Sequence, residues 1–433
     1  MASIHTLSTA QLKERRQKLQ EQYNRFKSQK LRLDMSRGKP CPEQLDLANG
    51  MLELIRPEDG FQAKNGMDTR NYGGLDGIPE AKELFAPMLE VSTRELIIGG
   101  NSSLSMMHDT IARAMFHGVY GSLIPWGKLP VVKFIAPTPG YDRHFAICEL
   151  FHIEMITVDM LDDGPDMEIV EKLVREDEAI KGIWCVPKYS NPQGITYSDE
   201  VVDRLASMPT KAEDFRIFWD DAYAVHHLTE EPDSLKNILA ACKEAGNPNR
   251  VFQFSSTSKI SFSGAGVAMM AASESNVDFI LKQLSVQTIG PDKINQLRHV
   301  RFFKSMDGIQ EHMRKHAAII RPKFERVLSI LEAELGDRQM ASWSQPNGGY
   351  FISLNTMDGC AKAVVEMAAE AGVVLTKAGA TYPYGIDPRD RNIRLAPTYP
   401  SLEELTTAIE VLCLCVQIVG INKLLSDKEE YSA

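Results

Sequence analysis

Short apolar runs that alternate with amphipathic stretches constrain the fold of this chain more than any other feature of its sequence. Between about residues 95 and 272 the runs are three to five residues long, and segments of helical pattern separate them. Strands that are short and apolar on both faces are typical of a mostly parallel sheet covered by helices. The sequence therefore predicts an α/β unit built on seven strands. They are Leu96–Ile98, Val131–Ile135, Met155–Val158, Ile183–Val186, Ile217–Trp219, Val251–Phe254 and Val267–Ala271.

The two ends of the chain predict a second, smaller α+β unit. An amphipathic helix is expected over 9–28, and a long helix over 308–335 with Pro322 as a candidate break or kink. The later elements are a turn and strand (347–354), a helix (361–371), an apolar segment (373–376), a strand (393–396) and a closing helix containing the apolar run 405–419. This pattern divides the chain into an amino-terminal part of a small domain (1–55), a large domain (56–310) and the carboxyl-terminal part of the small domain (311–433).

Composition limits the kinds of binding partner and the cellular compartment that we expect for this protein. The formal charge of -10 argues against nonspecific binding to nucleic acid or anionic membranes, which depends on dense positive charge. The seven cysteines are scattered, odd in number and without a CxxC pair, which predicts free core thiols and no metal site. There is no hydrophobic signal core, and run 405–419 is too short and too polar to span a bilayer. We expect a cytoplasmic protein.

Polar clusters follow three of the predicted strands. Each cluster alone is an ordinary turn, helix cap or loop. Because ligands of parallel sheets gather at the carboxyl ends of the strands, three clusters in succession predict a site at that edge. The clusters are Asn191-Pro192-Gln193-Gly194, Asp220-Asp221-Ala222-Tyr223 and Ser255-Ser256-Thr257-Ser258-Lys259.

An anion site is predicted upstream of these clusters. The first strand is followed by Gly99-Gly100-Asn101-Ser102-Ser103 and then by a helical pattern. A Gly/Ser turn that opens a helix presents free backbone N–H groups and the positive end of the helix dipole. A plain helix cap is the alternative interpretation.

In this order, the motifs N-P-x-G, D-x-A-Y and S-x-S-K resemble the class I aminotransferases among the fold-type I pyridoxal-phosphate (PLP) enzymes. The resemblance runs from the SRGKP segment at Ser36–Pro40 to NIRLAPT at Asn392–Thr398. The SKISFSGAG segment is most similar to the bacterial aspartate-aminotransferase-like group. The resemblance implies an α/β fold with a large domain around a mostly parallel seven-stranded sheet, a smaller α+β domain, and PLP as cofactor.

The resemblance also implies roles for individual residues. Lys259 would hold PLP as a Schiff base, Asp220 would keep the pyridine nitrogen protonated, and Tyr223 and Asn191 would donate to the phenolic oxygen. The remaining cofactor contacts would come from Asn101, Ser102, Ser103, Ser256 and Ser258 at the phosphate, from Tyr141 stacked on the ring, and from Tyr72 of the neighbouring subunit in a homodimer with shared active sites. The substrate contacts would be Arg394 at the α-carboxylate, Asn191, and Gly38 between the cations Arg37 and Lys39.

One position departs from the family pattern. Many relatives carry an arginine eight residues after the lysine, where it grips the phosphate, and this chain has Val267 there. Backbone amides and hydroxyls, or a basic residue from elsewhere, would have to replace it.

The predicted reaction is amino transfer from an amino acid to a 2-oxo acid. Aspartate or glutamate is the expected donor and 2-oxoglutarate the expected acceptor. The resemblance to the aspartate-aminotransferase-like group implies this, and Arg37, the better candidate, or Lys39 could pair with a distal carboxylate. A lyase or decarboxylase on the same fold, or an enzyme for hydrophobic or aromatic amino acids, remains an alternative. A regulator with an aminotransferase-like domain is disfavoured because only about 30 residues precede Ser36. No predicted strand is followed by the G-x-G-x-x-G of a nicotinamide dehydrogenase.

Overall fold

The computed structural model describes residues 4–336 and 339–430, which form two compact units. The larger unit comprises Pro42–Ser190 and Ile195–Ala317. The smaller unit comprises the described residues up to Cys41, the segment Asn191–Gly194, and the described residues from Ala318 onward. The boundaries of these compact units lie at 41/42 and 317/318, whereas the predicted domain boundaries lie at 55/56 and 310/311. The division into domains at the predicted boundaries stays a prediction.

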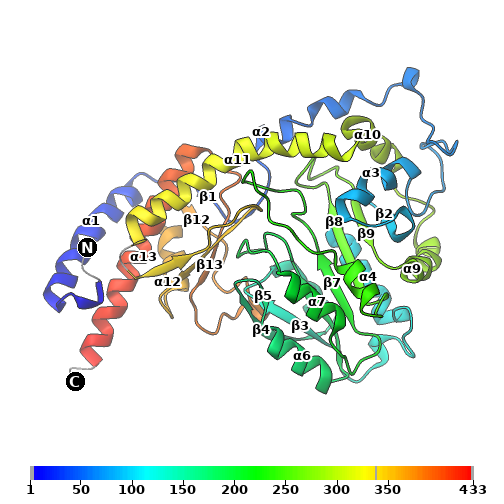
Figure 1. Cartoon of the computed structure of the whole chain (residues 1–433). Helices are drawn as coiled ribbons and strands as arrows, with labels where there is room; N and C mark the ends of the chain where they lie inside the picture. The colour runs from blue at the N-terminus through cyan, green and yellow to red at the C-terminus, as the bar shows by residue number, and fades with distance from the viewer. Residues whose placement is uncertain (1–3, 337–338, 431–433) are drawn as a thin grey trace. The chain divides into compact units, whose positions relative to one another are not determined.

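A mixed sheet forms the centre of the larger unit (Figure 1). All seven predicted strands are present, and the fold-type I prediction is confirmed. An eighth strand of two residues, β5, was not predicted because Gly164-Pro165 has no apolar pattern. In spatial order the strands are β2 (Leu96–Ile98), β9 (Ala268–Ala271), β8 (Val251–Ser256), β7 (Arg216–Asp220), β6 (Ile180–Cys185), β3 (Lys133–Thr138), β4 (Glu154–Leu161) and β5 (Gly164–Pro165).

The strands from β8 through β4 pair in parallel, and both outer ends of the sheet are antiparallel. The carboxyl ends of β6, β7 and β8 therefore meet at one edge of the sheet. This geometry places the segments that follow these three strands at a common edge, as the sequence predicted.

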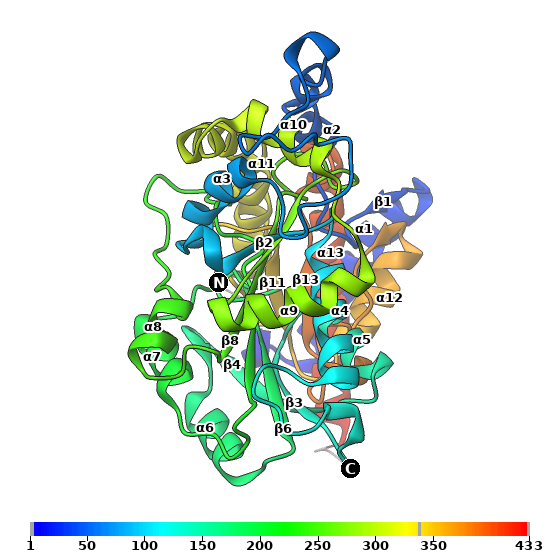
Figure 2. The same cartoon turned by 90° about the vertical axis from the view of Figure 1, so that its right-hand side faces the viewer.

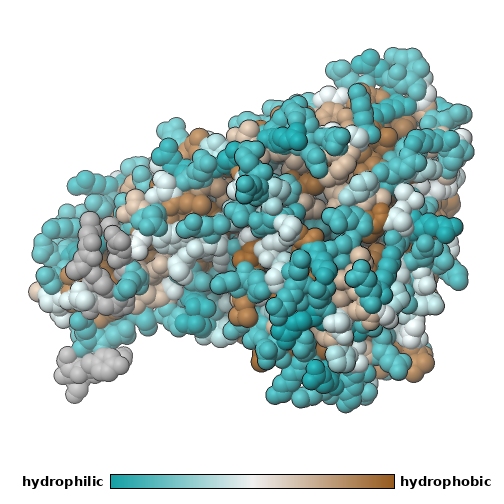
Figure 3. All heavy atoms as spheres, viewed as in Figure 1, coloured by the Kyte–Doolittle hydropathy of each residue, from teal (hydrophilic) through white to brown (hydrophobic). Residues whose placement is uncertain are grey.

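Helices cover both faces of the sheet (Figure 2). Neighbouring residues of a strand point to opposite faces, so Ile183 packs with one helix layer and Trp184 with the other. One layer is α6 (Met167–Glu176), α7 (Asp199–Ser207) and α8 (Ile238–Glu244); the other is α4 (Ser103–His117), α5 (Asp142–Leu150) and α9 (Glu274–Gln287). The outward surfaces of α6 and α7 are hydrophilic in Figure 3, as expected for helices with one buried face.

Further helices pack around the β2 end of the sheet. They are α3 (Pro79–Leu89), α10 (Lys293–Phe303) and the start of α11 (Met306–Leu335), while the short α2 (Pro42–Asp46) lies near the start of this unit in the chain. Pro322 lies inside α11 without ending it, so the candidate break is wrong. Short 3₁₀ segments occur at Ile4–Thr6, Asn49–Glu53, Pro57–Asp59, Thr93–Glu95, Trp126–Lys128 and Pro383–Gly385.

The described part of the smaller unit contains an antiparallel sheet, the part of α11 from Ala318 onward and three further helices. The sheet consists of β10 (Ala341–Trp343), β11 (Ile352–Thr356) and β13 (Asn392–Leu395), and a two-residue parallel pair joins β1 (Leu33–Asp34) to β12 (Val373–Val374). The helices are α1 (Thr9–Ser28), α12 (Ala361–Glu370) and α13 (Leu402–Glu430). The predicted helix over 9–28 is confirmed, and Ser8 and Gln11 close its start as a capping box.

Helix α13 is long and apolar enough to cross a membrane by length and composition. Most of its apolar stretch is buried inside the protein, where it packs against α1 and α12. This burial is that of a core helix. All seven cysteines are buried as well, as predicted for core thiols.

Candidate active site

The turn between β2 and α4 has the geometry of an anion site. Ser102 is the N-cap of α4, and its Oγ accepts from the backbone N of Ser105 at 3.3 Å. The amide of Asn101 donates to the carbonyl oxygen of Gly264 at 3.3 Å, and the Ser258 hydroxyl donates to the carbonyl oxygen of Asn101 at 3.5 Å. Two predicted phosphate ligands, Asn101 and Ser258, therefore lie side by side, and Ser103 begins the helix next to them.

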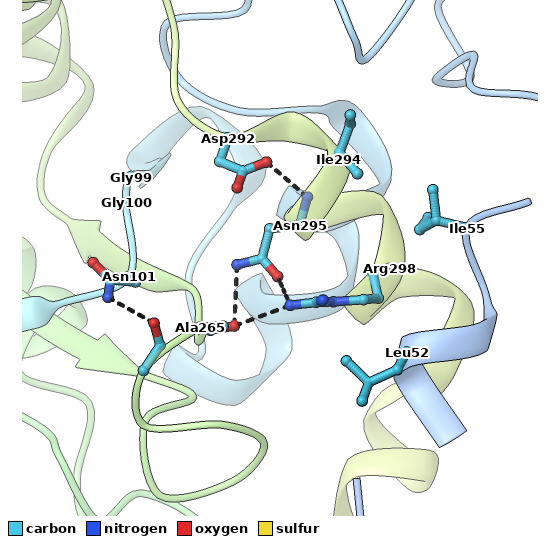
Figure 4. A pocket seen from close by; sticks show the side chains of 11 residues that line it. Leu52, Ile55, Gly99, Gly100, Asn101, Ala265, Asp292, Ile294, Asn295 and Arg298 are labelled. Atoms are coloured by element: carbon cyan, nitrogen blue, oxygen red, sulfur yellow. Dashed lines mark hydrogen bonds between the residues drawn. The ribbon is translucent and has the colours of Figure 1, made fainter. Parts of the chain in front are cut away.

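A pocket of about 500 Å³ opens beside this turn (Figure 4). Arg298 is the only cation among the described residues that line it. Its guanidinium donates to the carbonyl oxygen of Ala265 at 3.4 Å and to the side chain of Asn295. Arg298 is thus engaged with the loop that carries Lys259.

The structure shows the role of Val267, which stands where many relatives carry an arginine. Val267 is buried, with its side chain in the apolar core, and its backbone N–H donates to Oγ1 of Thr257 at 2.8 Å. Position 267 therefore contributes a backbone hydrogen bond to the lysine loop rather than a cation.

Asp220 ends β7 and is buried in the larger unit. Its Oδ2 lies 2.9 Å from Nε2 of His144, and the His144 ring stacks on Trp184 with ring centres 4.3 Å apart. Oδ1 of Asp220 is buried and has no hydrogen-bond partner among the described residues. A buried acceptor without a partner is costly, so this oxygen favours a ligand that brings a donor.

Asp221 belongs to a different environment from Asp220. It lines a cavity of about 180 Å³ with Lys188 and Gln253. Burial raises the pKa of Asp221 to about 7, against the opposing effect of Lys188, while the charge of Asp220 acts in the same direction as burial. The two adjacent carboxylates are therefore not interchangeable.

Tyr223 is buried and Lys259 is half-buried, and Nζ of Lys259 lies 5.2 Å from the centre of the Tyr223 ring. Burial lowers the pKa of Lys259, and Asp220 partly opposes this shift. A partly desolvated amine with a lowered pKa is a better nucleophile and base at neutral pH than a solvated lysine. In the residues just before Lys259, the Ser256 hydroxyl donates to Oγ of Ser258 at 3.0 Å.

Two predicted aromatic ligands also belong to the larger unit. Tyr141 immediately precedes α5, and its ring lies edge-on to His144 with ring centres 4.9 Å apart. Tyr72 is 78% exposed in the protomer, which suits a side chain that reaches another subunit.

The smaller unit brings together several predicted substrate ligands. Arg394 on β13 is buried, and its guanidinium donates to Oδ1 of Asn191 at 3.2 Å and lies 4.9 Å from the centre of the Phe351 ring. Gly38 lies against the same ring, because a Cβ there would be 2.5 Å from Cζ of Phe351. Arg394 and Gly38 therefore lie against the Phe351 ring, and Asn191 is bonded to Arg394.

The two cations next to Gly38 are exposed. Lys39 lies over the ring of Tyr399 with Nζ 3.8 Å from its centre, and the Lys39 carbonyl oxygen accepts from Thr398 at 2.9 Å. Arg37 lies close enough to Asp34 to lower the pKa of that carboxyl, behind the larger effect of the hydrogen bonds from Ser36.

Sequence reasoning missed the histidines of this site. His144 pairs with Asp220, and His226, His299 and His312 contact the loop that carries Lys259. No motif marks these histidines, because each comes from a different element and meets its partner only through the strand order and helix packing.

Comparison with known proteins agrees with the fold. The family described as aspartate amino-transferase matches residues 7–428. A Corynebacterium glutamicum protein named aspartate aminotransferase is 46% identical over 402 residues, covering 93% of each chain. The crystal structure of an aspartate transaminase from the same species superposes with a TM-score of 0.95 at 43% identity, covering 98% of this chain and 99% of that one.

A more distant structure shares the fold alone. It is an α-aminoadipate aminotransferase of Thermus thermophilus in complex with N-(5'-phosphopyridoxyl)-L-leucine, at a TM-score of 0.72 and 19% identity over 91% of this chain and 93% of that one. The matches over nearly the whole length, to proteins of one activity class, show that this chain is an aminotransferase and belongs to the aspartate aminotransferase family.

Proposed function

We propose that this aminotransferase uses PLP held on Lys259 to move the amino group of aspartate or glutamate onto a 2-oxo acid such as 2-oxoglutarate. The observation that carries the cofactor assignment is the buried Oδ1 of Asp220, which has no protein partner among the described residues. An acceptor in that position matches a protonated pyridine nitrogen.

The other residues of the larger unit fit the same cofactor. Lys259 offers an amine with a lowered pKa for the covalent link, and the amino-terminal end of α4 at Ser102 and Ser103 offers N–H groups to a phosphate. Tyr141 supplies an aromatic ring next to His144. When bound, PLP withdraws electrons from the substrate carbon.

The protein's own residues would then control charge and proton movement. Asp220, oriented by His144, would hold the ring nitrogen in its protonated form. The amine of Lys259, with its lowered pKa, would accept and return a proton at the substrate carbon. Tyr223 and Asn191 would donate hydrogen bonds to the phenolic oxygen.

Arg394 would bind the α-carboxylate of the substrate. It is buried and presents a planar two-pronged donor, which matches a carboxylate better than a lysine does. The Asn191 side chain, already bonded to Arg394, would orient the guanidinium.

An acidic donor is supported by the relatives and by Arg37 and Lys39. The Corynebacterium glutamicum relative and the crystal structure from that species are both named for aspartate. Arg37 is exposed and could turn toward a distal carboxylate, and Lys39 is the second candidate. Tyr72 supports a homodimer with shared active sites, and we propose a cytoplasmic location.

Borohydride reduction tests the cofactor assignment. The purified protein should absorb visible light through its bound cofactor, and reduction should fix PLP onto the peptide that contains Lys259. A modified peptide that lacks Lys259 would refute the central assignment. A donor screen with and without 2-oxoglutarate separates the reactions, since a lyase or decarboxylase forms product without an acceptor.

The substrate assignment is tested with Arg37→Ala and Lys39→Ala, each assayed with aspartate and with alanine or phenylalanine. A distal-carboxylate ligand should cost aspartate turnover roughly 2–3 kcal/mol more than alanine turnover. Equal losses on all donors would remove the residue from the specificity argument. A parent enzyme inactive on both dicarboxylic amino acids would refute the donor assignment.

A further inference from the structure

The turn Thr257–Ser261, which carries Lys259, is a single helical turn that does not continue. The backbone N–H groups of Ile260 and Ser261 both donate to the carbonyl oxygen of Thr257, at 2.9 and 2.8 Å. The carbonyl groups of residues 258–260 have no following helical residues to bond, so their oxygens need other donors.

Side chains supply those donors one carbonyl at a time. The Ser263 hydroxyl donates to the carbonyl oxygen of Ser258 at 2.7 Å. Nε2 of His226 donates to that of Lys259 at 3.3 Å, and Nε2 of His312 donates to that of Ile260 at 2.8 Å. Two imidazoles from different elements therefore hold the backbone on and immediately after the lysine.

A third imidazole, His299 on α10, engages the side chains of the turn. Its Nε2 lies 2.8 Å from Oγ of Ser261 and 3.2 Å from Oγ1 of Thr257. Its Nδ1 lies 2.7 Å from the carbonyl oxygen of Asn295. A carbonyl oxygen only accepts, so Nδ1 carries the proton, and in the neutral ring Nε2 accepts from a hydroxyl.

The neutral form of His299 follows from its surroundings. The side chains of Thr257, Ser261 and His299 are almost fully buried. Burial lowers the pKa of His299 to about 4, so the ring is neutral near pH 7.

The hydroxyl pair extends this contact to position 267. Oγ of Ser261 and Oγ1 of Thr257 are 2.9 Å apart, and Oγ1 of Thr257 accepts from the N–H of Val267 at 2.8 Å. A continuous buried chain therefore runs from the backbone of Val267 through both hydroxyls to His299. The two hydroxyl residues stand two positions before and two positions after Lys259.

We propose that His299 is a positioning residue for Lys259, acting through Thr257 and Ser261 to fix the turn from which the lysine side chain extends. The role in catalysis rests on the proposed function of Lys259, whereas the restraint on the turn does not. His226 and His312 hold the backbone of the same turn. A fixed turn keeps the amine within reach of its reaction partners, and small displacements of a reacting group are costly in rate.

Hydrogen exchange of the purified protein, without turnover, tests the restraint. Losing one buried hydrogen bond should speed the exchange of amides 260, 261 and 267 about tenfold in His299→Leu. Ser261→Ala removes the shorter of the two His299 contacts without altering α10 and should give a similar increase, so the test stands even if His299→Leu folds poorly. His299→Gln retains an acceptor and should restore part of the protection.

Gln296→Leu is the matched control, because Gln296 is equally buried on the same helix and its Oε1 accepts from Ile78 N at 2.9 Å instead. Its exchange in 257–267 should stay at the parental rate. The pH titration of the visible absorbance of lysine-bound PLP should shift in His299→Leu and Ser261→Ala but not in Gln296→Leu.

Parental exchange in both His299→Leu and Ser261→Ala, or an equal increase in Gln296→Leu, would overturn the proposal. These exchange rates decide it even if the protein transfers no amino group. A failure of the proposed function is seen separately, in the borohydride and donor experiments.

Discussion

Nε2 of His144 and Oδ2 of Asp220 are 2.9 Å apart, and both side chains are buried. We expect Asp220→Ala to lower kcat by about a hundredfold or more while keeping part of its PLP, since a fixed carboxylate stabilises the charged ring. Turnover and bound-cofactor absorbance measure the two effects. Asp221→Ala is the control, and a comparable loss there with Asp220→Ala nearly active would show that the wrong carboxylate was chosen.

Asp221 should make stability depend on pH in the opposite sense from an ordinary carboxylate. Its pKa is raised to about 7 by burial, so its contribution to stability is complete below pH ~4 and is lost as the pH rises toward 7. Asp221→Asn stays neutral and should gain stability relative to the parent between pH 5 and pH 8, by up to about 3 kcal/mol. Urea unfolding of both proteins at pH 5 and pH 8 measures the difference between their free energies of unfolding. A difference in free energy of unfolding that stays the same at both pH values would contradict this explanation.

His316 should contribute acid sensitivity. Its pKa is lowered to about 3, first by burial and then by the neighbouring His312. The unfolded chain therefore binds more protons than the folded protein, and stability falls as the pH drops from about 6.5 toward 3, by up to about 4 kcal/mol. His316→Gln carries no charge and should lose less stability than the parent between pH 7 and pH 4.5. Equal losses in urea unfolding would count against the assignment.

Gly38→Ala should weaken substrate binding through Phe351. The new Cβ would lie 2.5 Å from Cζ of Phe351, so the ring must move, and that ring lies under the guanidinium of Arg394. We expect KM for the amino donor to rise about tenfold with a smaller change in kcat. Gly50→Ala is the control, because its nearest neighbour beyond the adjacent chain is Phe302 at 3.8 Å. An unchanged KM in Gly38→Ala would separate Phe351 from substrate binding.

We expect Tyr72 to contact the PLP of the neighbouring subunit in a homodimer. Its side chain is 78% exposed in the protomer. An aromatic side chain that contacts PLP is expected to be covered, which a second subunit would do. Sedimentation should show a dimer, and Tyr72→Phe should weaken PLP binding by about tenfold through the lost hydrogen bond. Tyr384→Phe, at another exposed tyrosine, should bind PLP like the parent. A fully active monomer would refute the shared site.

The sequence predicted the elements whose pattern is local. All seven apolar runs are strands, and helix 9–28 has the expected bounds, because strand alternation and helix periodicity are set by neighbouring residues. The strand β5 escaped prediction because two residues carry no period. Pro322 was a candidate break or kink, and it does not end the helix, since tertiary packing can outweigh a local preference.

By itself, the sequence determined the family, the order of the polar clusters at the strand ends, and the lysine that follows the S-x-S motif. These features depend on residue type and short spacing. Only the tertiary structure decided which of two adjacent carboxylates meets His144, and it alone brought three histidines around the lysine turn. Those contacts join residues far apart in the chain, and burial in the folded protein, which no short segment contains, sets the protonation of the groups that make them.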